Sequence, residues 1–174
     1  MQKTRHNTAA MDLAIAAQLG DSATSTDVTA SAMSATTAQS DARAIVARFY
    51  EDFDGGKLGS FDAVDPAFTA TVFGTTVLDW TGFVAFGQSF LDAFSDGRHE
   101  FDFVVAEGGN VVTIGHYRGH QDGELMGVPA TGNEVSFTVM HIDRVENGRI
   151  IEHRGIGDIN AMWAQLGVQP PAAG

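Results

Sequence analysis

Residues 134–167 read EVSFTVMHIDRVENGRIIEHRGIGDINAMWAQLG, and this stretch decides the fold. Two runs rich in β-branched residues flank Asn147-Gly148, and Asn-Gly between such runs is the strongest short-range signal of a β-hairpin. The second run leads into apolar residues at helical spacing, which Asp158 would cap at the start and Gly167 would end. The stretch therefore predicts a hairpin followed directly by a helix.

The geometry of the turn decides which side chains share a face of this hairpin. A two-residue turn would place His141 opposite Arg154. A type I turn closed by a glycine bulge at Gly148 would place His141 opposite His153. Because a slip of one residue moves a strand's side chains to the opposite face, the two alternatives predict different sites.

The composition bounds the fold and excludes several kinds of function. A chain of 174 residues is long enough for one domain with a substantial core. Its formal net charge of −12 argues against nucleic acid or an anionic membrane surface as a partner, since both attract basic proteins. The absence of cysteine excludes disulfides, thiolate metal sites and cysteine nucleophiles. No apolar run approaches membrane-spanning length, and we expect a cytoplasmic protein.

The first 40 residues differ in composition from the rest of the chain. Residues 21–40 are almost entirely Ser, Thr and Ala without periodicity, so they offer little apolar surface to offset the entropy of ordering. Residues 9–19 have the spacing of a short helix. We predict a flexible N-terminal extension over residues 1–40, a domain over residues 41–169 and a tail over residues 170–174.

Helices come before strands along this predicted domain. We expect a first helix, capped by Ser40 or Asp41, that buries Ile45, Val46, Phe49, Tyr50 and Phe53. A short helix after Ser60 and a β-like stretch at residues 68–79 precede an aromatic-rich helix capped by Thr81. Four strands follow, at residues 99–106, 111–120, 135–145 and 149–157. Helices followed by an antiparallel meander indicate the α+β class.

Three stretches resemble a known family: ARAIVARFYEDFDGGKLGSFDAV (42–64), VVAEGGNVVTIGHYRGHQDGELMGVPATG (104–132) and HIDRVENGRIIEHRGIGDINAMWAQLG (141–167). They are similar to the SnoaL-like polyketide cyclases of the NTF2-like superfamily, over about residues 41–169. The resemblance implies a cone-shaped barrel: a strongly curved antiparallel sheet, wrapped by about three N-terminal helices, that encloses an apolar pocket.

The resemblance also implies where a site should lie, and one position departs from it. Characterised cyclases of the family use a pocket Asp as general acid/base, directly after a His-Arg pair on the last strand. Here the pair is His153-Arg154, and the next residue is Gly155. The family's pocket histidine on the preceding strand matches His141. Because the family places both positions in the pocket, we prefer the bulged turn, which puts His141, His153 and Gly155 on one face.

Four residues are the predicted catalytic set. An imidazole titrates near pH 7, so His141 is the best acid or base left once the Asp is missing, although it also fits a hydrogen-bonded core histidine. His153 would support it or be structural. Asp143 would orient one imidazole, as a carboxylate does in a triad, or end a strand in solvent. Asp158 fits a helix cap better than an acid at the pocket mouth.

Substrate contacts are expected from Tyr50, Phe137, Val139, His116, Arg118 and Gly155. On the strand at residues 111–120, either His116 and Arg118 or Tyr117 faces inward. The histidines lack the spacing of paired ligands on one element, so we expect no metal, and no cofactor motif is present. His6 and His99 look incidental.

The predicted function is cofactor-free acid/base chemistry on a hydrophobic polyketide-like or polycyclic small molecule. Enolisation with cyclisation or isomerisation, in a cyclase, isomerase or lyase type of enzyme, is the leading hypothesis. A binding protein without turnover is the alternative, because Gly155 removes the family acid. A hydratase or epoxide hydrolase is a third, provided that Asp143 and Asp158 both point inward. We also expect a homodimer formed through an outer sheet face carrying Met140, Ile142 and Ile156.

Overall fold

The computed structural model describes residues 25–170, and the chain divides after Ser34 into two compact units. The unit that begins at Ala35 holds the whole β-sheet. The short helix predicted at residues 9–19 lies outside the described residues. Within residues 25–170, no helix is both long enough and apolar enough to cross a membrane.

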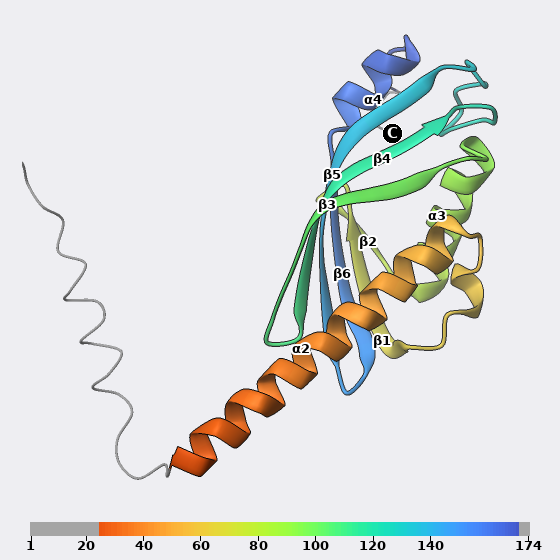
Figure 1. Cartoon of the computed structure of the whole chain (residues 1–174). Coiled ribbons are helices and arrows are strands. Elements are labelled where there is room, and N and C mark those ends of the chain that lie inside the picture. The colour runs from red at the N-terminus through yellow and green to blue at the C-terminus, as the bar shows by residue number, and fades with distance from the viewer. Residues whose placement is uncertain (1–24, 171–174) are drawn as a thin grey trace, which may run out of the picture. The chain divides into compact units, whose positions relative to one another are not determined.

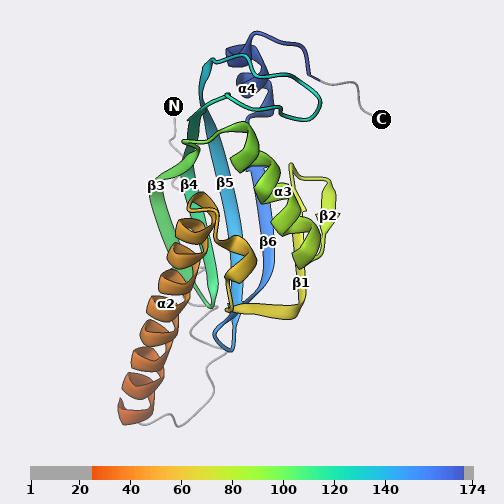
Figure 2. The same ribbon diagram turned by 90° about the vertical axis from the view of Figure 1, so that its right-hand side faces the viewer.

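Six strands form one curved sheet, in the order β2-β1-β6-β5-β4-β3 (Figures 1 and 2). Their bounds are β1 Val64–Val72, β2 Thr76–Leu78, β3 Arg98–Glu107, β4 Asn110–His120, β5 Glu134–Glu146 and β6 Arg149–Gly157. All neighbours are antiparallel except β1 and β6, which run parallel. The predicted meander of the last four strands and the α+β class are confirmed.

The hairpin of β5 and β6 closes differently from the prediction. Asn147 and Gly148 have φ of 49° and 74°, the two positive values of a type I′ turn, and Glu146 pairs with Arg149. The extra residue is Ile151, between the pairs Val145–Ile150 and Arg144–Glu152. The bulge predicted at Gly148 is therefore wrong.

This later bulge has a packing reason, and it preserves the predicted faces. Ile150 and His153 are both buried on the inner face although they are three residues apart. Because side chains alternate along a strand, one extra residue must be inserted between them, and the bulge at Ile151 supplies it. His141 then pairs with Gly155 rather than with His153, a shift of two residues. Because side chains alternate with a period of two, His141, His153 and Gly155 still share the inner face.

Helix α2 (Ser25–Asp54) begins well before the predicted start, so the predicted cap at Ser40 or Asp41 is wrong. Between these bounds the sequence contains neither Gly nor Pro, and alanine recurs throughout. Nothing in this stretch interrupts a helix. The tract predicted to be flexible is therefore helical from Ser25 onward.

Helix α3 (Trp80–Ala93) is capped by Asp79, whose side chain accepts a hydrogen bond of 2.8 Å from the backbone N–H of Gly82. The predicted cap Thr81 is wrong, because Trp80 belongs to the helix and packs on Phe68. The C-terminal helix α4 (Ile159–Leu166) has its predicted cap, Asp158, and its predicted end at Gly167.

The short helix predicted after Ser60 is not present. Residues Leu58–Ser60 form a single 3₁₀ turn, η1, and β1 already begins at Val64. The reason lies in the sheet: the carbonyl of Ala63 accepts a 2.8 Å hydrogen bond from the N–H of Ile150 in β6, so the chain is extended there.

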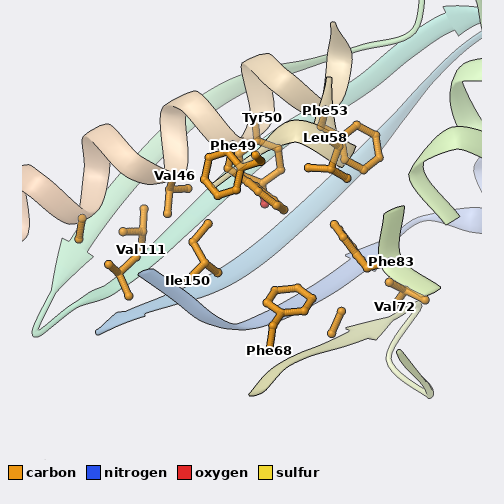
Figure 3. Close-up of a cluster of buried hydrophobic side chains, with 14 residues drawn as sticks. Val46, Phe49, Tyr50, Phe53, Leu58, Phe68, Val72, Phe83, Val111 and Ile150 are labelled. Carbon is orange, nitrogen blue, oxygen red and sulfur yellow. The ribbon is translucent and has the colours of Figure 1, made fainter. Parts of the chain in front are cut away.

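Helices α2 and α3 lie on the same face of the sheet (Figure 2), and a core of aromatic side chains fills the space beneath them. Figure 3 shows Phe49 of α2 and Phe83 of α3 directed toward Ile150 and Phe68 of the sheet. A second cluster joins α4 to β5 through Met162, Leu166 and neighbouring residues. Between the end of α2, α3 and the sheet, this core leaves a cavity.

Candidate functional site

The cavity is lined mainly by aromatic rings, with three imidazoles among them. Its lining comprises Tyr50, Phe53, Val72, Phe73, Phe83, Phe86, Phe90, His99, Tyr117, Phe137, Val139, His141, His153, Gly155, Ile156 and Gly157. Its volume is about 60 Å³, room for only a few water molecules. Phe73, Phe86 and Gly157 are half-exposed, so the cavity opens to solvent between the β1–β2 turn, α3 and the end of β6.

A buried carboxylate stands behind the cavity and joins helix α2 to the hairpin. Asp143 of β5 is fully buried, and its Oδ1 lies 2.8 Å from Nδ1 of His153 on β6. Its Oδ2 accepts a 2.9 Å hydrogen bond from the Tyr50 hydroxyl of α2. Burial, and then the charge of Asp143, raise the pKa of Tyr50 well above its ordinary value, so this hydroxyl keeps its proton. Asp143 thus orients His153 with Nε2 left free to accept a proton.

His141 lies beside this pair in a different electrostatic state. Its Nδ1 is 3.2 Å from the Thr113 hydroxyl of β4, and its ring centroid is 5.4 Å from that of His153. Burial, and then the charges of His153 and His99, lower the pKa of His141 well below its ordinary value. His141 is therefore a neutral imidazole at pH 7, suited to hydrogen bonding rather than to holding charge.

Gly155, where the resemblance implies an acid, is where the two imidazoles converge. A Cβ built on Gly155 would lie 3.0 Å from Nε2 of His153 and 3.3 Å from Cδ2 of His141. Glycine at this position leaves room for both rings, and the edge of His153 occupies space that a side chain would need.

The structure brings together most of the predicted site residues. His141, His153, Tyr50, Phe137, Val139 and Gly155 all line the cavity. Asp143 lies directly behind it, in contact with Tyr50 and His153.

Two predicted substrate contacts need correction. His116 and Arg118 lie on the outer face of β4, where they approach Asp102 and Glu100 of β3 at 3.5 Å and 2.9 Å. Tyr117 is the residue of this strand that lines the cavity. Because side chains alternate along a strand, Tyr117 must face the side of the sheet opposite to His116 and Arg118. Which side is the inner one depends on the helices that cover it, and the sequence of the strand alone does not show this.

Asp158 also lies away from the cavity. Its side chain is exposed and accepts a 3.0 Å hydrogen bond from the N–H of Ala161, so it is a helix cap. The carboxylate pair required by the hydratase hypothesis is therefore missing, because Asp143 and Asp158 do not face a common space.

Sequence reasoning missed His99, which lines the cavity from β3. Its Nδ1 lies 2.7 Å from Asp54 Oδ1, and its backbone N–H donates to Asp54 Oδ2 at 2.8 Å. A weak signal was available: His99 and Phe101 alternate in a strand and so share a face. Among residues 25–170, no three His, Cys, Asp or Glu side chains form a group that could hold a metal ion.

The family model for SnoaL-like polyketide cyclases matches residues 44–166, and the chain belongs to this family. Its fold is the α+β cone of the NTF2-like proteins, as the resemblance implied. Among curated proteins, no sequence matches the chain.

Solved structures agree with this assignment. IdmH from Streptomyces antibioticus, a candidate polyketide cyclase, is 31% identical with a TM-score of 0.65, over 73% of this chain and 99% of that one. A candidate SnoaL-like polyketide cyclase from Jannaschia sp. CCS1 is 20% identical with a TM-score of 0.70, over 87% and 100%. AclR from Streptomyces galilaeus, a candidate hydroxylase, is 21% identical with a TM-score of 0.68, over 76% and 99%. The last two likenesses concern the fold alone.

Proposed function

We propose that this chain is a cofactor-independent acid/base enzyme that removes a proton next to a carbonyl group of a hydrophobic ligand. The observation that carries the proposal is the buried chain of hydrogen bonds from Tyr50 through Asp143 to His153, at 2.9 and 2.8 Å. A carboxylate bound to Nδ1 fixes the tautomer whose Nε2 is unprotonated, as in catalytic triads. His153, rather than His141, is then the base.

In the proposed step, Nε2 of His153 takes a proton from the carbon next to the carbonyl. The C–H electron pair becomes the C=C bond of an enolate, and the carbonyl π pair moves onto oxygen. His141 donates a hydrogen bond from Nε2–H to that oxygen, in the tautomer whose unprotonated Nδ1 faces the Thr113 hydroxyl at 3.2 Å. The aromatic walls exclude water, which strengthens both interactions.

The proposed ligand is a polyketide-like or polycyclic carbonyl compound, and the enolate would go on to cyclise or isomerise. Family membership and the aromatic lining both support this class of ligand. A cavity of about 60 Å³ is smaller than a bicyclic molecule, so the rings at its mouth, Phe73 and Phe86, must move to admit one.

The test uses β-tetralone, a bicyclic ketone with two activated methylene groups, and follows exchange of its protons for deuterium by NMR. The wild type should exchange them faster than buffer. His153→Ala should lower the rate above buffer by about 10²-fold or more. Asp143→Asn should act in the same direction, because an amide NH₂ facing Nδ1 reverses the tautomer.

His116→Ala is the matched control, since His116 pairs with Asp102 on the outer face of the sheet. It should leave exchange unchanged. A wild type that exchanges no faster than buffer, or a His153→Ala variant as fast as the wild type, would end the proposal.

A binding protein without turnover is the second candidate, and the replacement of the family acid by Gly155 favours it. That candidate predicts that β-naphthol, an aromatic analogue of the tetralone enol, binds the wild type while β-tetralone exchange stays at the buffer rate.

A further inference from the structure

A second histidine–carboxylate pair lies at another part of the same cavity. Asp54 holds His99 at two points: one carboxylate oxygen lies 2.7 Å from Nδ1 and the other accepts the backbone N–H at 2.8 Å. The His99 side chain is only 7% exposed, yet it lines the cavity. Both hydrogen bonds to Asp54 use Nδ1 and the backbone N–H of His99, and neither uses Nε2.

The His99 pair and the His153 pair lie on different strands of the sheet. His153 is on β6, His141 on β5 and His99 on β3, and β5 lies between the other two strands in the sheet order. The ring of His141 is 5.4 Å from the ring of His99 and 5.4 Å from that of His153. A neutral imidazole thus lies between two imidazoles that each hold a carboxylate at Nδ1.

The end of helix α2 connects Asp54 to the other histidine–carboxylate pair. Asp54 is the last residue of α2, where the helix dipole disfavours a negative charge. Tyr50, one turn earlier, holds the other pair through Asp143. One turn of the helix therefore supports both imidazoles.

The chain also contains a pair with the same geometry outside the cavity. Asp96 accepts the backbone N–H of His120 at 2.7 Å, and its other oxygen lies 2.7 Å from Nδ1 of His120. The His120 side chain is 56% exposed and is not part of the cavity lining. The two pairs show that this carboxylate–histidine geometry also occurs away from the cavity. What distinguishes His99 from His120 is its enclosure within the cavity.

We propose that His99, held by Asp54, is a second proton-transfer residue, which serves an atom of the bound ligand on the other side of His141 from His153. This inference rests on the proposed function, because it adds a second site of proton transfer to the same reaction. It makes the cavity bifunctional: one carbon loses a proton at His153 and a second atom exchanges a proton at His99.

The step at His99 balances in either direction. As imidazolium, His99 gives its Nε2 proton to a carbon or oxygen whose electron pair forms the new bond, and is left neutral with Nδ1–H on Asp54. As neutral imidazole, it takes a proton and leaves the electron pair on the ligand. An intramolecular condensation needs both events, since one carbon must lose a proton while the accepting oxygen gains one.

The experiment measures β-tetralone exchange in a His153→Ala background. Exchange above the buffer rate should persist there, because either methylene can reach His99. Adding His99→Ala should lower it by about tenfold or more, to the buffer rate. Adding His120→Ala, the matched control, should leave it in place.

Asp54→Asn keeps the test valid if the His99→Ala variant folds poorly. The backbone N–H can only donate, so the amide oxygen must face it, and the NH₂ group then faces Nδ1. This reversal of the tautomer should remove residual exchange while the geometry is kept.

Contact with ligand is measured separately by NMR in the wild type. The Nε2 nitrogen resonance of His99 should shift when β-naphthol saturates the cavity, and that of His120 should not.

The outcomes separate this inference from the proposed function. Exchange that drops to the buffer rate in His153→Ala alone overturns the role of His99 and leaves the proposed function standing. Residual exchange that survives loss of His99, or an unshifted His99 resonance, also overturns it. A wild type without exchange counts against the proposed function, and this inference fails with it.

Discussion

His141 and Gly155 pair directly across β5 and β6, so the ring of His141 lies over a residue without a side chain. A Cβ at this position would meet His153 Nε2 at 3.0 Å. The family's acid therefore has no room of its own here unless the imidazoles move.

Gly155→Asp should consequently lower β-tetralone exchange instead of creating a cyclase. A carboxylate in contact with both imidazoles favours their charged forms, so the pKa of His141 should rise toward its ordinary value. NMR titration of His141 measures this. Gly155→Ala isolates the effect of crowding, and a faster reaction in Gly155→Asp than in the wild type would contradict the prediction.

Tyr50→Phe should lower the free energy of unfolding by about 1.5–3 kcal/mol, because it removes a hydrogen bond to a buried carboxylate. Urea denaturation measures the change. Tyr117→Phe is the matched control, since the buried Tyr117 hydroxyl has no hydrogen-bond partner among the described residues. That variant should be neutral or slightly more stable, and equal losses in both would show that Asp143 does not depend on Tyr50.

Acid should destabilise the protein through His141. Its folded pKa is below the unfolded value of about 6.5, so between the two the unfolded chain binds a proton that the folded chain does not. Stability from this residue is complete above about pH 6.5 and is lost as pH falls, at up to about 1.4 kcal/mol per pH unit. His141→Gln should remove this slope in urea midpoints measured at several pH values.

His120 provides a control of opposite sign. The hydrogen bond and charge of Asp96 raise its pKa, so its contribution is present below about pH 6.5 and lost as pH rises through the folded pKa. His120→Gln should therefore lower stability on the acid side.

If His141→Gln and the wild type have the same dependence of stability on pH, His141 is not held neutral in the folded protein.

The outer sheet face should mediate a homodimer. Ile156 pairs with Met140, Met140 with Ile114 and Ile114 with Phe103, which makes one apolar row across four strands. Phe103 and Ile156 are 66% and 60% exposed. Such a row on a lone chain is typical of an interface.

Light scattering at micromolar concentration should give twice the monomer mass, and Ile156→Lys should halve it. Val77→Lys is the control, because Val77 is equally exposed on β2, away from that row. A monomeric wild type would rule the dimer out.

The hairpin shows what local sequence could and could not predict. Asn147-Gly148 located the turn. Alternation left two assignments of the faces open, and the family resemblance favoured the one with His141, His153 and Gly155 together. The register was wrong because burial of Ile150 decides where the bulge falls, and that depends on α2. The cap at Asp79 was missed because nearby Thr81 is also a good cap residue, and the helix upstream of Ser40 was missed because Ser40 and Asp41 are good cap residues too.

Except for Tyr50 on α2, the correctly predicted site residues are local to the hairpin. His141, Asp143 and His153 lie on neighbouring strands that one turn connects. His99 meets Asp54 from an element far away in sequence, and no local pattern signals that meeting. The direction of Tyr117 likewise follows from which face the helices cover.

Tyr50 and Asp54 are four residues apart and lie on one face of the last turn of α2, which ends just before Gly55-Gly56. Tyr50 binds Asp143, the partner of His153, whereas Asp54 binds His99 directly, so this one turn anchors both histidine–carboxylate pairs. Fraying of this single turn would free Asp143 from Tyr50 and His99 from Asp54 together, so both proposed proton-transfer residues would lose support from α2 in one local opening while the sheet stayed folded. Amide hydrogen exchange at the end of α2 would therefore measure the fraction of molecules in which this turn is closed and both histidine–carboxylate pairs are held.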